Sequence, residues 1–181
     1  MIAITYAALI SIISFLWILV RIWHWKKNGR ISWKREIQLL LVYICITVVV
    51  RFTFFPFSKV DGKIQPLVFD VAKIFPPRIN LIPMFFLFDY EIRREALINL
   101  IGNTAMFLPL GIVWPSVFHK LDTHRKVIAS GVATSLAIEI LQLPFFDRVS
   151  DIDDLILNSL GFLTGYGIFL LFKAIARIIK K

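Results

Sequence analysis

The stretch EILQLPFFDRVSDIDDLILNSLG, residues 139–161, places a cluster of carboxylates between two apolar runs of the chain. The acids are Glu139, Asp147, Asp151, Asp153 and Asp154, and the only cation among them is Arg148. A charge at the centre of a bilayer costs about 2.5 to 3.5 kcal/mol on insertion scales, whereas a charge near the membrane surface costs less. The stretch therefore predicts a polar region at the membrane surface, where one helix ends and the next begins.

The composition of the whole chain agrees with a membrane protein. Of its 181 residues, 58% are hydrophobic, and the mean hydropathy is +0.76, which is far above that of a soluble domain. A bilayer core of about 30 Å requires about 20 mostly apolar residues per helix. The segments that qualify are residues 2–20, 37–55, 96–118, 127–143 and 154–172. We expect an all-α fold: one polytopic transmembrane helical bundle of about five helices over residues 1–181.

The distribution of basic residues predicts the topology of this bundle. The connector RIWHWKKNGRISWKR, residues 21–35, carries six Lys or Arg and no acid. Under the positive-inside rule it is cytoplasmic, which puts the N-terminus outside and, after five crossings, the C-terminus inside. The acidic connector 144–153 then lies outside. Because topology accounts for the net charge of +9, we expect no nucleic-acid partner.

Polar side chains gather near the outer ends of four of the predicted helices. They are Arg51, Asn99, Asn103, Glu139, Gln142, Asp154 and Asn158. Asn99 and Asn103 share one helix face at i,i+4, and so do Asp154 and Asn158. Four helices thus bring polar groups to one depth, and we predict a shallow polar site that is open to the exterior.

Two local interactions follow from the same pattern. Glu139 is the ionisable side chain placed deepest in the bilayer, and Arg51 is the cation that could pair with it at the least cost. Ser150 is the expected N-cap of the last helix, because a serine hydroxyl can accept a hydrogen bond from the first free backbone N–H groups.

Four stretches in this order, RINLIPM, NLIGNTAMFLPLG, EILQ and DRVSDIDDLILNSLGFLTG, resemble the VanZ-like membrane protein family over residues 51–167. The matching positions are Arg51, Arg78, Asn80, Pro83, Asn99, Asn103, Pro109, Gly111, Glu139, Gln142, Arg148, Asp151, Asp154, Asn158, Gly161 and Gly165. Met84 stands where the family often has phenylalanine, and residues 57–77 have no clear counterpart in the family. The family takes its name from a protein linked to low-level resistance to the glycopeptide teicoplanin.

The resemblance implies a multi-pass protein of the bacterial plasma (inner) membrane, in contact with lipid, that acts in the cell envelope. Its expected ligand is a lipid-linked cell-wall precursor or a glycopeptide antibiotic. The expected ligand-binding residues are Arg51, Arg78, Asn80, Asn99, Asn103, Glu139, Gln142, Arg148, Asp151, Asp154 and Asn158. The three histidines, His24, His119 and His124, fall on the predicted cytoplasmic side, which disfavours a histidine-ligated zinc site. No cofactor or metal is expected.

Several alternatives stay open on the sequence. The charged residues could form a buried network that only fixes helix packing. Glu139 and Asp154 could instead be the acid and base of a membrane-embedded enzyme that modifies a lipid or cell-wall precursor. A scaffold subunit of an envelope complex is a third possibility. Residues 80–90, NLIPMFFLFDY, could be a re-entrant or interfacial segment above the site, or a plain amphipathic surface segment.

Overall fold

Helices make up most of the chain in the computed structural model, which describes residues 2–56, 60, 62–83 and 93–180. The α-helices over those residues are α1 (Tyr6–Asn28), α2 (Trp33–Phe54), α3 (Arg93–Val117), α4 (His124–Gln142) and α5 (Ile152–Ile179). The all-α class is therefore confirmed. Most of the segment 80–90, for which a re-entrant or surface conformation is the expectation, lies outside the described residues.

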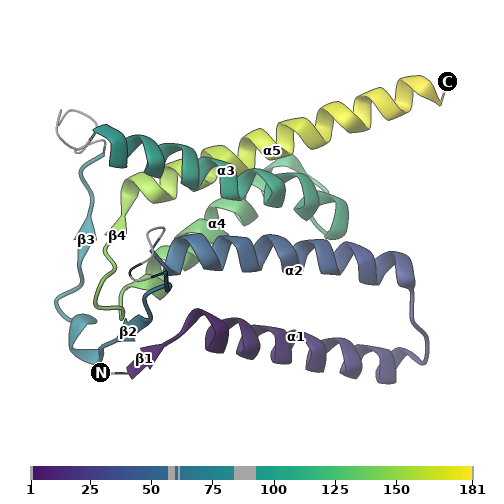
Figure 1. Cartoon of the computed structure of the whole chain (residues 1–181). Helices are drawn as coiled ribbons and strands as arrows, with labels where there is room; N and C mark the ends of the chain where they lie inside the picture. Colours follow the sequence, from purple (N-terminus) through teal and green to yellow (C-terminus); the bar gives the residue numbers. More distant parts are fainter. Residues whose placement is uncertain (1, 57–59, 61, 84–92, 181) are drawn as a thin grey trace.

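Four of these helices are long and apolar enough to cross a membrane, namely α1, α2, α3 from Leu97 onward, and α5. The exception is α4, whose 19 residues include Arg125, Lys126 and Glu139. It nevertheless packs against α5 and also contacts α3 (Figure 1). The α1–α2 turn, the α3–α4 turn and the C-terminus lie at one end of the molecule, here called the basic end. The N-terminus and the short strands lie at the opposite end, here called the strand end.

The first helix differs from the predicted segment 2–20 at both ends. Residues Ile2–Ile4 form a strand, β1, which pairs antiparallel with β2 (Leu67–Phe69). The helix then continues to Asn28, and Gly29 ends it with a φ of 65°, which a glycine adopts at no steric cost. Much of the basic connector predicted for residues 21–35 is thus helical. The insert 57–77 supplies the partner strand that holds the N-terminus.

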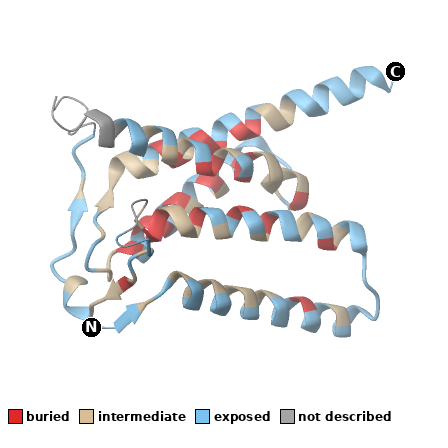
Figure 2. Cartoon of the chain, viewed as in Figure 1, coloured by how far each residue is buried: buried red, intermediate tan, exposed pale blue. Residues whose placement is uncertain are grey.

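Buried side chains concentrate where α2, α3, α4 and α5 meet (Figure 2). Phe107 of α3 and Phe162 of α5 are almost completely buried there, and Val49 of α2 packs in the same cluster. By contrast, α1 exposes large apolar side chains such as Phe15 and Leu16 along its length. An outer helix with this composition can face lipid, since lipid tails are as apolar as leucine.

A buried ion pair attaches α1 to α2. Arg21 donates from Nε to Oε2 of Glu36 at 2.8 Å, and its Nη2 donates to Oε1 of the same carboxylate. Both residues are less than a tenth exposed. Sequence analysis placed Arg21 in the basic connector 21–35, which was predicted to be cytoplasmic, and Glu36 lies just after that stretch. In the structure, helix α1 extends past Arg21, and the Arg21 side chain binds Glu36 of α2.

Candidate ligand-binding site at the start of α5

The site depends on a very close approach between α3 and α5. A Cβ atom added to Gly161 would lie 2.1 Å from the carbonyl oxygen of Thr104, and one on Gly165 would lie 2.0 Å from that of Leu108. Only glycine fits at such distances. Because the later residue of α5 meets the later residue of α3, the two helices run parallel. The first turns of both helices therefore lie next to each other at the strand end.

This packing brings the carboxylate of Asp154 between two asparagines of α3. Oδ1 of Asp154 accepts hydrogen bonds from Nδ2 of Asn99 at 3.0 Å and from Nδ2 of Asn103 at 2.5 Å. Nδ2 of Asn103 also donates to Oδ1 of Asn99 at 2.8 Å. Asn99 is exposed, whereas Asn103 is buried. The three residues thus form a polar group that leads from the surface into the helix interface.

A second group of polar contacts surrounds Asp151, which is the N-cap of α5. Its Oδ1 accepts from the backbone N–H of Asp153 at 2.9 Å, so the cap is Asp151 and not the expected Ser150. Its Oδ2 accepts from Nδ2 of Asn80 at 3.0 Å, and its backbone N–H donates to Oε2 of Glu139 at 2.9 Å. The buried carboxylate of Glu139 is thereby bound to the beginning of α5.

Two short strands fix the position of Asn80. β3 (Ile79–Asn80) pairs parallel with β4 (Ser150–Asp151), and the backbone N–H of Ser150 donates to the carbonyl of Arg78. The Arg78 side chain donates to the carbonyl oxygen of Phe146 at 2.9 Å and is itself exposed. The connection before α3 is therefore joined to the acidic connector by backbone pairing.

The remaining predicted cations bind backbone carbonyls at the C-terminal end of α2. Nη1 of Arg51 donates to the carbonyl oxygens of Phe55 and Pro56, both at 3.2 Å, and Nε of Arg148 donates to that of Phe54 at 3.2 Å. These carbonyls have no intrahelical partner, and a cation there also suits the helix dipole. Among the described residues no ion pair joins Arg51 to the carboxylate of Glu139, so that expectation is wrong.

Arg148 connects this group of carbonyls to the acids. Burial lowers the pKa of the Arg148 guanidinium, and the nearby carboxylates of Asp147 and Asp154 partly oppose that effect. A cavity of about 290 Å³ opens beside Arg148 and Asp147. Phe54, Gln65 and Leu67 also line it, so it lies between the end of α2, the insert and the acidic connector.

Three buried side chains near the acids carry polar atoms that have no hydrogen-bond partner among the described residues. Both Oδ1 and Nδ2 of Asn158 are unpartnered although the residue is only 1% exposed. Oε1 of Gln142 and Oγ of Ser135 are also unpartnered, while Nε2 of Gln142 donates to the carbonyl oxygen of Thr53 at 2.6 Å. Leaving a buried polar group unpaired costs about 1 to 3 kcal/mol, and such groups usually meet water or a ligand.

Sequence analysis missed Ser135 and the carbonyls of α2. The spacing of Ser135 from Glu139 and Gln142, at i,i+4 and i,i+7, places all three on one face of α4 and could have identified it. Backbone carbonyls give no such signal, because every residue has one. In the described part of the chain, no three His, Cys, Asp or Glu side chains form a group that could hold a metal ion.

Taken together, the helices and this polar group define a multi-pass α-helical membrane protein with hydrogen-bonding groups concentrated at one end of the bundle. Within that class, the VanZ/LLP1 family model matches residues 40–173, and the chain belongs to this family. The match includes all the residues predicted for the site. No curated protein and no solved structure matches the chain.

Proposed function

We propose that the polar group at the start of α5 faces the outside of a bacterial plasma membrane and binds an envelope ligand there. The ligand is a lipid-linked cell-wall precursor or a glycopeptide antibiotic, and its binding lowers susceptibility to glycopeptides. The link to glycopeptides rests on the family resemblance, whereas the choice of binding groups is supported by the polar contacts at the start of α5.

One observation carries the proposal: Asn158 lies fully buried, one helical turn below Asp154, with both of its side-chain polar atoms unpartnered. Above it, Oδ1 of Asp154 already accepts hydrogen bonds from Asn99 and Asn103. An amide whose donor and acceptor have no partner among the described residues is suited to a polar ligand or to the water that the ligand displaces.

The surroundings suit both the polar groups and the lipid part of such a ligand. Carboxylates and amides can bind sugar hydroxyl and peptide N–H groups, which lipid-linked precursors and glycopeptides both carry. Arg148, at the edge of the 290 Å³ cavity, can bind a phosphate or carboxylate group. Exposed apolar side chains on α3, such as Leu97 and Ile101, offer lipid-facing surface next to Asn99.

The test compares bacteria that express the wild-type chain, Asn158→Leu or Asn28→Ala at matched membrane levels. Asn28 is an exposed asparagine at the last residue of α1, at the basic end and away from the start of α5. Asn28→Ala therefore serves as the control. We expect teicoplanin susceptibility to be lowered by the wild type and by Asn28→Ala, and to return to that of the empty host with Asn158→Leu. Equal protection by all three chains would overturn the proposal.

The same cultures test the alternative function, a membrane enzyme that modifies a lipid or cell-wall precursor. The observation in its favour is that Glu139 and Asp154 both reach the first turn of α5. Mass spectrometry of membrane lipids and muropeptides separates the two functions. A binder leaves both profiles unchanged and protects in proportion to its copy number, whereas an enzyme leaves an altered precursor that is absent from cells expressing Glu139→Gln.

A further inference from the structure

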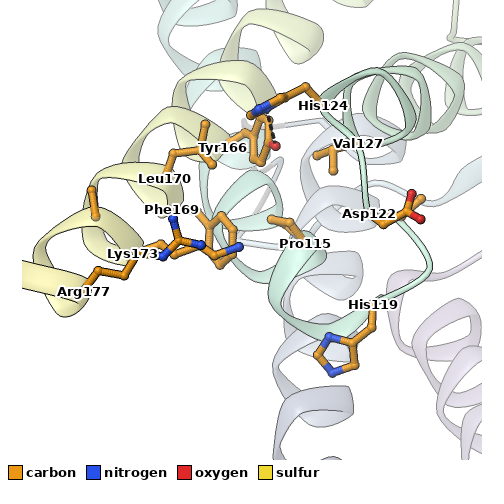
Figure 3. Close-up of a pocket in the computed structure, with 12 residues that line it drawn as sticks. Pro115, His119, Asp122, His124, Val127, Tyr166, Phe169, Leu170, Lys173 and Arg177 are labelled. Atoms are coloured by element: carbon orange, nitrogen blue, oxygen red, sulfur yellow. Dashed lines mark hydrogen bonds between the residues drawn. The ribbon is translucent and has the colours of Figure 1, made fainter. Parts of the chain in front are cut away.

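A second cavity lies at the basic end, far along α5 from the site described above. It has a volume of about 450 Å³ and opens between the α3–α4 turn, the first turn of α4 and the C-terminal half of α5 (Figure 3). Its polar lining consists of His119, Asp122, His124, Tyr166, Lys173 and Arg177. No function assigned so far uses these residues.

Lys173 and Arg177, the lysine and arginine of this lining, have no acidic partner in the part of the chain that the structure describes. Lys173 and Arg177 lie at i,i+4 and therefore on one face of α5. Within the described residues neither of them forms an ion pair, and Nζ of Lys173 lies over the ring of Phe169, 5.9 Å from its centroid. The lining holds one acid, Asp122, whose Oδ1 accepts from Nζ of Lys126 at 2.7 Å. That hydrogen bond lowers the pKa of Asp122, so its charge is retained but offset by Lys126.

Additional hydrogen-bonding groups lie at the wall of the same cavity. Nδ1 of His124 is hydrogen-bonded to the hydroxyl of Tyr166 at 2.8 Å, which orients the imidazole ring at the cavity wall (Figure 3). His124 is also the first residue of α4, whose N-cap is Thr123. The free backbone N–H groups and the positive end of a helix dipole at this position favour an anion. The histidine and the helix end belong to α4, whereas the two cations belong to α5, so the donors come from two elements.

The rest of the lining is apolar, and so is the adjoining surface. Pro115, Val127 and Leu170 line the cavity alongside the cations. Elsewhere on α5, outside the cavity lining, Phe172 is 61% exposed and Ile178 is 74% exposed. Exposed side chains of this kind on a membrane-spanning helix are suited to lipid, which places the cavity next to a bilayer. A basic pocket between membrane helices is a common site for the headgroup of an anionic lipid.

We propose that this cavity binds the phosphate of an anionic phospholipid from the leaflet at the basic end. Lys173 and Arg177 neutralise the phosphate, His124 and the start of α4 donate hydrogen bonds to it, and the apolar wall contacts the glycerol backbone of the lipid. Free inorganic phosphate shares the charge chemistry but has no group that would use the apolar wall.

The experiment uses the full-length protein purified in detergent, with phosphatidylglycerol, phosphatidylcholine or inorganic phosphate as the added probe. Native mass spectrometry gives the bound fraction, and the midpoint of thermal unfolding gives the stabilisation. We expect phosphatidylglycerol to bind and stabilise the wild type and phosphatidylcholine to do neither. Removing both cations in Lys173→Ala/Arg177→Ala should weaken phosphatidylglycerol binding by about tenfold or more, because each charge-assisted contact is strong.

Two further variants separate the cavity from general surface charge. Lys26→Ala/Lys27→Ala removes the same charge from the same end but outside the cavity, and we expect it to bind phosphatidylglycerol like the wild type. Ala174→Trp keeps every charge but fills the cavity, and we expect it to lose binding. Lys173, Ala174 and Arg177 are all exposed, so the changes leave the buried core intact.

Three outcomes would overturn the proposal. If the Lys26/Lys27 variant weakened binding as much as the Lys173/Arg177 variant, only the overall positive charge of this end would matter. If phosphatidylcholine bound equally well, the cavity would not recognise an anionic headgroup. If inorganic phosphate alone gave the full stabilisation, the site would belong to a soluble anion.

Discussion

Asn103 of α3 donates a hydrogen bond to the carboxylate of Asp154 in α5, across 51 residues of sequence. The bond is possible because Gly161 and Gly165, about two and three turns after Asp154 in α5, let the backbones of the two helices touch. The hydrogen bond between Asn103 and Asp154 therefore depends on the close packing of α3 against α5. Changes to either should affect both the stability of the helix pair and the geometry of the proposed ligand site.

Replacing Asn103 by alanine should lower the free energy of unfolding by about 1 to 3 kcal/mol, because a half-buried carboxylate then loses a donor. The free energy can be measured by denaturant titration in mixed micelles. Asn28→Ala, at an exposed asparagine, is the control and should change stability by less than about 0.5 kcal/mol. If the two variants were equally stable, the hydrogen bond to Asp154 would contribute nothing measurable.

Replacing Gly161 by alanine should destabilise the protein by about 1 to 3 kcal/mol, because the new Cβ would lie 2.1 Å from the carbonyl oxygen of Thr104. Gly167 lies in the same helix and would meet nothing within 4 Å. Gly167→Ala should therefore be neutral or stabilising by up to about 1 kcal/mol, as expected for alanine in a helix. Thermal unfolding of the two variants in one detergent tests the difference. If both variants lost the same amount of stability, the result would argue against close α3–α5 packing.

Removing one partner of the buried Arg21–Glu36 pair should be costly, whereas removing both should cost much less. Arg21→Met leaves the carboxylate of Glu36 buried without its partner, and we expect a loss of about 3 to 5 kcal/mol. The double variant Arg21→Met/Glu36→Met should recover most of that loss. A double-mutant cycle in micelles gives the coupling energy, and simple additivity of the two single changes would contradict the observed pair.

Asn158→Leu should stabilise the ligand-free protein by about 1 kcal/mol or more, because the change removes two unpartnered polar atoms from a buried position. The same variant should lose protection against teicoplanin. Higher thermal stability together with lost protection would separate a binding role from a structural role. A destabilised Asn158→Leu would instead show that the amide has a partner that supports the fold.

Much of the architecture could be predicted because it depends on local chemistry. Apolar segments of sufficient length predict helices in a membrane, and the i,i+4 spacing of Asn99 and Asn103 predicts that they share a face. The acids of the stretch 139–161 were expected at one end of the bundle, and the structure brings Glu139, Asp151 and Asp154 together there.

The specific partners could not be predicted. Arg51 was expected to bind Glu139, yet it binds the carbonyl oxygens of Phe55 and Pro56, while Glu139 binds a backbone N–H of the acidic connector. Opposite charges favour an ion pair, but the folded distance between two side chains decides whether they can form one. Backbone N–H and C=O groups also compete for a charged side chain, and the sequence does not show which of them lie nearby because every residue carries them.

The sequence by itself thus determined that the chain is a membrane-spanning helical protein and which residues lie at its polar end, because hydropathy and helical spacing are properties of neighbouring residues. The tertiary structure alone decided that α3 and α5 run parallel in backbone contact, that β1 pairs with the insert, and that Lys173 and Arg177 face a cavity beside His124. These relationships depend on which distant elements pack together, and that choice is made by steric fit and by the satisfaction of buried backbone groups.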